Sequence, residues 1–232
     1  MKTVVIHGQN HKGSTYHVGR ILAEKAARKE EITEFFLPRD LNHFCLGCYK
    51  CLEDDTKCPF YDEKKIIMDA IEEAELLIFT TPTYCLRASA PMKSFIDLTF
   101  TNWLTHRPKA SMFKKKAVVV STAAGAGIQS AMKDIATCLK YWGVPYIKRL
   151  GFAVQAINWN DVSEKTKQNI EKKTTRIADK IVKKHVHVGV WMRVMFNLMR
   201  ISNNKPGNAD TLLRADYLHW KNNGWFDGKR PY

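Results

Sequence analysis

Residues 7–16 are His7-Gly8-Gln9-Asn10-His11-Lys12-Gly13-Ser14-Thr15-Tyr16, and this segment is the most informative one in the chain. The apolar run at 3–6 before it predicts a buried strand, and the residues after it predict a helix with Ile21, Leu22 and Ala26 on one face. A turn of this kind directs several backbone N–H groups and the positive end of the helix dipole toward one point. Gly13 allows the backbone to approach a ligand closely. The stretch therefore predicts a site for a phosphate monoester.

The hydroxyls of Ser14 and Thr15 have two interpretations. They can cap the N-terminus of the helix, as these residue types do in many proteins. They can also donate hydrogen bonds to a phosphate. The composition of this loop is compatible with both roles.

The chain has 232 residues, of which 45% are hydrophobic, as expected for one α/β domain with an appendage. No apolar run has the length of a membrane span, and Met1-Lys2 leads directly into the first strand, so we expect neither a span nor a signal peptide. Four of the six cysteines lie within 45–58. This crowding favours reduced thiols in the cytoplasm over a secreted disulfide framework.

The formal net charge is +14, and it is unevenly distributed: residues 163–232 hold 15 Lys and Arg against 6 Asp and Glu. A basic balance suits nucleic acid, but it equally suits small anionic cofactors. The sequence contains no zinc-finger pattern, no RRM-like aromatic motif and no low-complexity basic tail. We therefore expect no nucleic-acid partner.

Strand and helix patterns alternate along the chain. Apolar runs predict five strands, at 3–6, 32–37, 76–80, 117–121 and 146–154, and amphipathic patterns predict further helices at about 63–73, 90–101, 128–142 and 163–184. Continuous apolar strands separated by single helices indicate a parallel sheet covered on both faces, which is a three-layer α/β fold. Five such strands suit the order 2-1-3-4-5. In that order the ligand site lies outside the carboxyl ends of the strands, beside the first strand.

Two further loops should then meet the first one. The third strand is followed by Pro82-Thr83-Tyr84-Cys85-Leu86, where Tyr84 offers a flat face to a heterocycle. The fourth is followed by Thr122-Ala123-Ala124-Gly125, whose small side chains would let backbone amides reach the polar atoms of a ring. The alternatives are a strand that ends at a proline and a tight entry into a helix.

These motifs together resemble the flavodoxin-like NAD(P)H-dependent FMN reductases, and in particular the branch of the iron–sulfur flavoproteins. The similarity covers about residues 1–185. It includes the first loop, Pro82-Thr83-Tyr84, Lys93-Ser94-Phe95-Ile96-Asp97, His106-Arg107-Pro108 and the loop after the fourth strand. Gln9 and His11 depart from the Ser and Arg that are usual in the family.

The resemblance implies a flavodoxin-like FMN-binding domain over 1–185 and NAD(P)H as co-substrate. It implies that FMN contacts the three loops, through Gln9, His11, Lys12, Gly13, Ser14, Thr15, Pro82, Thr83, Tyr84, Cys85, Leu86, Thr122, Ala123, Ala124 and Gly125. No catalytic side chain is expected, because hydride passes to flavin N5 and then to a small-molecule or protein acceptor. The alternative is an electron-transfer flavoprotein, of the flavodoxin type or containing [4Fe–4S], without its own nicotinamide step.

The second informative segment is a cysteine-rich loop, 38–61, which contains Cys45, Cys48, Cys51 and Cys58. Thiolates spaced three, three and seven positions apart can wrap a [4Fe–4S] cluster, and the iron–sulfur flavoproteins resemble this chain in their compact spacing. The alternatives are an ordered loop of reduced cysteines without a cluster and, less favoured by the spacing, a zinc site.

The last segment, 186–232, predicts a helical and aromatic extension. Residues 188–200 have a helical pattern in which Arg193, Asn197 and Arg200 form a narrow polar stripe on a broad apolar surface. We expect this helix to pack on the core or on a second subunit, in a homodimer or homotetramer. The alternative is a helix that lies in a membrane interface.

Overall fold

The computed structural model describes all 232 residues of the chain, apart from the side chain of Pro206. The strands are β1 (Thr3–His7), β2 (Ile32–Phe36), β3 (Leu76–Tyr84), β4 (Arg87–Ala88), β5 (Lys116–Ala123) and β6 (Tyr146–Ala153). The α-helices are α1 (Ser14–Ala26), α2 (Lys50–Glu53), α3 (Tyr61–Glu73), α4 (Ala90–Leu98), α5 (Ile128–Tyr141), α6 (Glu164–Lys183), α7 (Val190–Asn203) and α8 (Arg214–Asn222). Short 3₁₀ turns occupy Lys29–Glu31, Asp55–Lys57, Phe100–Asn102, Ala110–Lys114, Trp159–Asp161 and Pro206–Asp210.

The five long strands form a parallel sheet in the order β2-β1-β3-β5-β6, which confirms the predicted order. In the register of β1, Val5 lies opposite Glu34 on one side and Ile78 on the other. The sixth strand, β4, was not predicted. It pairs antiparallel with the end of β3, where Arg87 lies opposite Tyr84.

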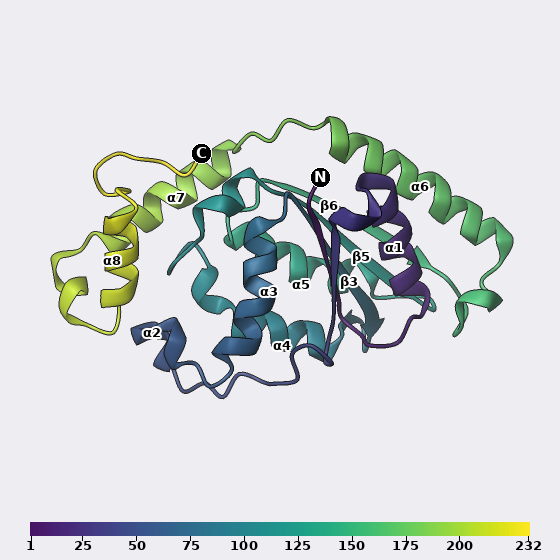
Figure 1. The fold of residues 1–232 in the computed structure, drawn as a ribbon, viewed down its shortest axis with the longest axis horizontal. Coiled ribbons are helices and arrows are strands. Elements are labelled where there is room, and N and C mark those ends of the chain that lie inside the picture. The colour runs from purple at the N-terminus through teal and green to yellow at the C-terminus, as the bar shows by residue number, and fades with distance from the viewer.

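Each face of the sheet has its own apolar core because successive side chains of a strand point in opposite directions. Val4 and Ile6 pack with the side chains of α3, α4 and α5. Val5 packs with α1 and α6 on the other face. Figure 1 shows this three-layer arrangement, with α1 and α6 on one side of the strands and α3, α4 and α5 on the other.

A third core joins the extension to the sheet domain. Phe196 of α7 and Trp220 of α8 are fully buried with Trp225, and they pack on Leu104 and Phe113. The helix predicted at 188–200 is present as α7, but its apolar surface is divided. Met192 and Phe196 face this core, whereas Val194 and Leu198 are exposed. Among the described residues, no helix is both long and apolar enough to cross a bilayer.

Candidate functional site

The loops that follow β1, β3 and β5 meet at one edge of the sheet. The amide of Gly8 donates a hydrogen bond to the carbonyl oxygen of Thr80 over 2.7 Å. The hydroxyls of Thr15 and Thr122 lie 2.5 Å apart, although 107 positions separate them in the sequence. These bonds fasten the first loop to β3 and to the end of β5.

The first loop leaves polar groups at the start of α1 without partners. Gly13 is the N-cap residue and has no side chain to satisfy the free N–H groups there. Ser14 is only 6% exposed, and its Oγ atom has no hydrogen-bond partner in the described structure. Neither hydroxyl caps the helix, so the capping interpretation of Ser14 and Thr15 is wrong.

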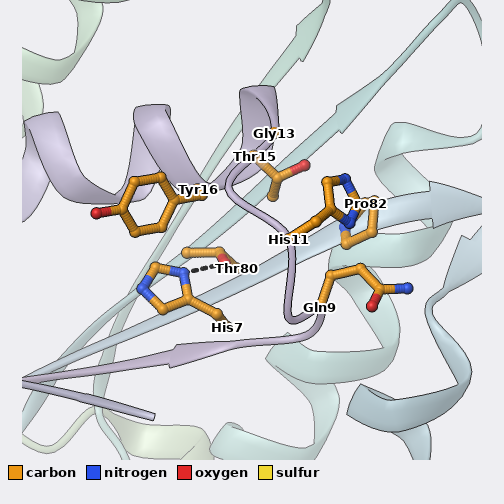
Figure 2. A pocket seen from close by; sticks show the side chains of 8 residues that line it. All are labelled: His7, Gln9, His11, Gly13, Thr15, Tyr16, Thr80 and Pro82. Carbon is orange, nitrogen blue, oxygen red and sulfur yellow. Dashed lines mark hydrogen bonds between the residues drawn. The ribbon is translucent and has the colours of Figure 1, made fainter. Parts of the chain in front are cut away.

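A small pocket lies between this loop and β3 (Figure 2). Its lining residues are His7, Gln9, His11, Gly13, Thr15, Tyr16, Thr80 and Pro82. The His11 ring lies close to Gly13: a Cβ atom at that position would be 2.8 Å from His11 Nε2. The first turn of α1 contains no acidic residue. The pocket therefore lies beside free amides and the positive end of a helix, which is the environment that a phosphate requires. The unpartnered Ser14 hydroxyl belongs to the same first turn of α1, although Ser14 is not one of the residues that line the pocket.

A buried polar chain that the sequence analysis did not identify supports the end of β1. His7 lies with Nδ1 3.0 Å from Thr80 Oγ1 and Nε2 2.8 Å from Glu34 Oε2. Arg20 of α1 donates to the other oxygen of Glu34. Burial raises the pKa of Glu34, but hydrogen bonds and charge from His7 and Arg20 outweigh it and hold the pKa below its ordinary value. Glu34 occupies an edge strand whose partner only the tertiary structure reveals, so no local motif marks it.

The second loop is the tight turn between β3 and β4. Cys85 and Leu86 both have left-handed backbones, with φ of +48° and +62°. Two residues in this conformation form a type I′ hairpin turn, and non-glycine residues adopt it at some cost in energy. The turn leaves Tyr84 45% exposed and Leu86 59% exposed at the edge of the sheet. An aromatic and an aliphatic side chain are thus available to a planar ligand.

The third loop packs directly on the second. Thr122 and Ala123 are buried, whereas Ala124 and Gly125 are exposed. The hydroxyls of Thr83 and Ser121 lie 2.9 Å apart. Gly127 has φ of +86°, and a Cβ atom there would lie 2.6 Å from Cα of Leu86. All three loops that contain the predicted FMN contacts are therefore brought together at this edge.

The cysteine-rich loop lies at the same edge of the sheet domain, along the bottom of Figure 1 between β2 and α3. Cys45, Cys48, Cys51 and Cys58 are all free and line one pocket together with Asp97, Leu98 and Phe100. Burial raises the pKa of the Cys51 thiol, against the lowering effect of the Lys64 charge. Among the described residues, no three His, Cys, Asp or Glu side chains are close enough together to form a ready metal site.

Comparison with known proteins agrees with this geometry. Residues 1–158 match the sequence profile of the NADPH-dependent FMN reductases. The chain belongs to this family. It is therefore an oxidoreductase that uses FMN as its cofactor and NAD(P)H as its co-substrate.

Individual relatives have low sequence identity to this reductase. An iron–sulfur flavoprotein of Archaeoglobus fulgidus is 26% identical over 186 residues, which cover 79% of this reductase and 80% of the relative. An iron–sulfur flavoprotein of Methanocaldococcus jannaschii is 32% identical over 100 residues, which cover 42% of this reductase and 51% of the relative.

Among solved structures, the FMN-dependent NADH-azoreductase of Bacillus anthracis, in complex with FMN, has a similar fold. The TM-score is 0.60 at 11% identity, and the match covers 79% of this reductase and 100% of the azoreductase. At that identity the similarity demonstrates the flavodoxin-like fold alone.

The contact between the second and third loops gives a direct stability test. Replacing Gly127 by Ala should lower the free energy of unfolding by about 1–3 kcal/mol, because the residue has a left-handed backbone and its new methyl group would collide with Leu86. Urea denaturation measures the loss.

Gly125 provides the matched control in the same loop, since a Cβ atom there has no neighbour within 4 Å. Gly125→Ala should change stability by less than about 0.5 kcal/mol. Equal losses in the two variants would contradict close packing between the loops at Gly127.

Proposed function

We propose that the three loops hold FMN, with its phosphate on the first loop and its ring between the other two. The phosphate would bind the backbone amides and side chains of Gln9, His11, Lys12, Gly13, Ser14 and Thr15. The ring would contact Pro82, Thr83, Tyr84, Cys85, Leu86, Thr122, Ala123, Ala124 and Gly125. The observation that supports this assignment best is the buried Ser14 hydroxyl, which has no partner within the described structure.

Burial of the Ser14 hydroxyl without a partner costs free energy. A buried polar group without a hydrogen bond is unfavourable by about 1–3 kcal/mol. A ligand that accepts a hydrogen bond from the hydroxyl recovers this energy. A phosphate also complements the helix dipole and the nearby Lys12 ammonium. Lys12 is exposed, with its Nζ 5.5 Å from the centre of the Tyr16 ring, and remains free to approach an anion.

Bound FMN would supply the hydride and electron transfer between NAD(P)H and a second acceptor, which we propose is a small molecule or a protein. The residues of the chain would position the ring and make its polar contacts. The exposed Tyr84 and Leu86 would cover one part of the ring, and the amides at 123–125 would face its polar edge. No side chain needs to act as an acid or a base.

Loss of the Ser14 hydroxyl tests the phosphate assignment. Ser14→Ala should weaken FMN binding about 10-fold to 100-fold, because a hydrogen bond to a charged group contributes about 1.5–3 kcal/mol. Fluorescence titration of the apoprotein with FMN measures the change.

The control is Ser163→Ala at the start of α6, where the hydroxyl accepts a hydrogen bond from the amide of Thr166 over 3.3 Å. This variant removes a true helix cap and should leave the affinity for FMN unchanged. If Ser14→Ala also binds FMN as tightly as the wild type, Ser14 does not contact the phosphate.

Anaerobic mixing of the FMN-loaded protein with NADPH or NADH tests the nicotinamide step. We expect the flavin absorption band to disappear with at least one of the two. A band that persists with both would support the alternative of an electron carrier reduced by another protein.

We also propose that Cys45, Cys48, Cys51 and Cys58 bind a [4Fe–4S] cluster, which would supply one-electron transfer beside the flavin. The support is that the four thiols line a single pocket with mostly apolar walls. Four cysteine sulfurs are the donor set of such clusters. Because the thiols do not form a ready metal site, the loop would have to tighten around the cluster.

Iron and acid-labile sulfide analysis of protein prepared without oxygen tests this proposal. The wild type should contain about four of each per chain, and Cys51→Ser should lose most of both. Cys85→Ser is the matched control, because Cys85 is also a free thiol but lies outside the cysteine-rich loop. A wild type without iron and sulfide would reject the cluster and leave the cluster-free loop and the zinc site as the alternatives.

We further propose that the chain is a cytoplasmic homodimer or homotetramer in which the extension, 186–232, contributes to the subunit contact. Val190, Val194, Leu198 and Ile201 follow one another along α7, and each is at least half exposed. An apolar stripe of this length on a helix surface is typical of a protein interface.

A further inference from the structure

A single buried arginine joins the cysteine-rich loop to the C-terminal extension. Arg107 is 7% exposed. Its Nη2 donates to the carbonyl oxygen of Cys51 over 2.5 Å and to Asp55 Oδ1 over 3.1 Å. Its Nη1 donates to the carbonyl oxygen of Leu52 over 3.2 Å and to Asp216 Oδ1 over 2.5 Å. One guanidinium therefore contacts two elements that are distant in the sequence.

The contact on the extension is completely buried. Asp216 belongs to α8 and has no exposed surface. Its second oxygen lies 2.7 Å from His106 Nδ1, so both carboxylate oxygens are used by neighbouring residues of one segment. The indole of Trp220 donates to the carbonyl oxygen of His106 over 2.6 Å. The segment 106–108 is thus held by α8 on one side.

The contact on the cysteine-rich loop fixes the turn that presents Cys51. The backbone carbonyls of Cys51 and Leu52 point at the guanidinium, and Asp55 is held in place by Arg107 and by the hydroxyl of Thr101, which donates over 2.9 Å. Figure 1 shows α2, which contains Cys51, next to α8 at the end of the molecule away from α6. No other residue of the described chain donates a side-chain hydrogen bond to these two carbonyls.

The chemistry of this link requires arginine. A planar guanidinium presents five donors in a fixed arrangement and can satisfy two carbonyls and two carboxylates together. A lysine has the same charge but offers three donors from one point. Removing Asp216 would leave the buried cation with Asp55 as its one carboxylate partner and would break the contact between α8 and the His106 ring, while the Trp220 indole would still hold the His106 carbonyl.

We propose that Arg107 and Asp216 are positioning residues for the cysteine-rich loop, so that the C-terminal extension is an integral part of the cysteine site. Docking of α8 holds Arg107, Arg107 holds the Cys51–Leu52 turn, and this turn sets the position and accessibility of Cys51 in the pocket that it shares with Cys58. The inference rests on the proposed role of this loop as a working site.

The experiment measures alkylation of each cysteine by iodoacetamide in metal-free, reduced, full-length protein, with the modified peptides resolved by mass spectrometry. Arg107→Lys and Asp216→Asn should both increase the alkylation rate of Cys51 at least 10-fold relative to the exposed Cys45. Cys138 should remain protected in both variants, because it is buried in the core of the sheet domain. Its protection reports that the fold is intact.

Asn203→Ala is the matched control. Asn203 is buried in α7, and its amide donates to the carbonyl oxygen of Thr105 over 3.4 Å. It therefore joins the extension to the residue that precedes the segment 106–108, but it does not touch the cysteine-rich loop. Its Cys51 rate should equal that of the wild type.

Three results would overturn the proposal: an unchanged Cys51 rate in both test variants, an equal increase in Asn203→Ala, or exposure of Cys138 together with Cys51. The last would mean that the link stabilises the fold alone. Because the protein is metal-free, the result does not depend on the cluster. A positive result with no iron in the anaerobic wild type would retain the positioning role and reject the cluster.

Discussion

The parallel topology of the sheet forces three loops to meet at one edge, and the other features of the site follow from this meeting. Parallel strands place all their carboxyl ends on the same side, so the chain segments after β1, β3 and β5 must lie near one another. Hydrogen bonds between Gly8 and Thr80 and between Thr15 and Thr122 then fix their separation. The start of α1, with its uncapped N–H groups, and the turn at Cys85 and Leu86 belong to two of these loops.

The cysteine-rich loop and the extension form a second polar system beside the first. Apolar packing of Phe196 and Trp220 supplies the bulk of the contact between the extension and the domain. Arg107 and Asp216 add directional bonds that apolar packing lacks, and these reach the backbone of the cysteine-rich loop. The extension thus packs on the domain through one buried apolar surface. It also contacts, through the ion pair of Asp216 with Arg107, the loop that contains the thiol pocket.

Much of this architecture follows from local sequence patterns. Apolar runs predicted the five parallel strands and their order, and the composition of each loop identified the three segments that converge. What the sequence left open depends on long-range contacts. His7 and Glu34 meet across two strands, and Arg107 and Asp216 are 109 positions apart, so no local spacing marks either pair. The turn at Cys85 and Leu86 was not predicted, because non-glycine residues rarely adopt its left-handed backbone conformation.

The roles of the serine and threonine at the start of α1 also depend on a long-range contact that local sequence does not reveal. In the sequence they have the pattern of helix caps, whereas in the structure Gly13 is the cap and Thr15 bonds to Thr122. Thr122 of β5, which only the fold brings close, pairs with the Thr15 hydroxyl, whereas Ser14 Oγ has no partner in the described structure. The composition of the loop predicted an anion site, and packing determined which of the two hydroxyls is paired.

Calorimetric titration of the apoprotein with FMN and with riboflavin shows whether the first loop binds a phosphate, because the two ligands differ only in that group. We predict that FMN binds at least 100-fold more tightly than riboflavin, since the loop at 9–15 supplies donors and positive charge to that group. Equal affinities for the two ligands, or no binding of either, would contradict the assignment of this loop as a phosphate site.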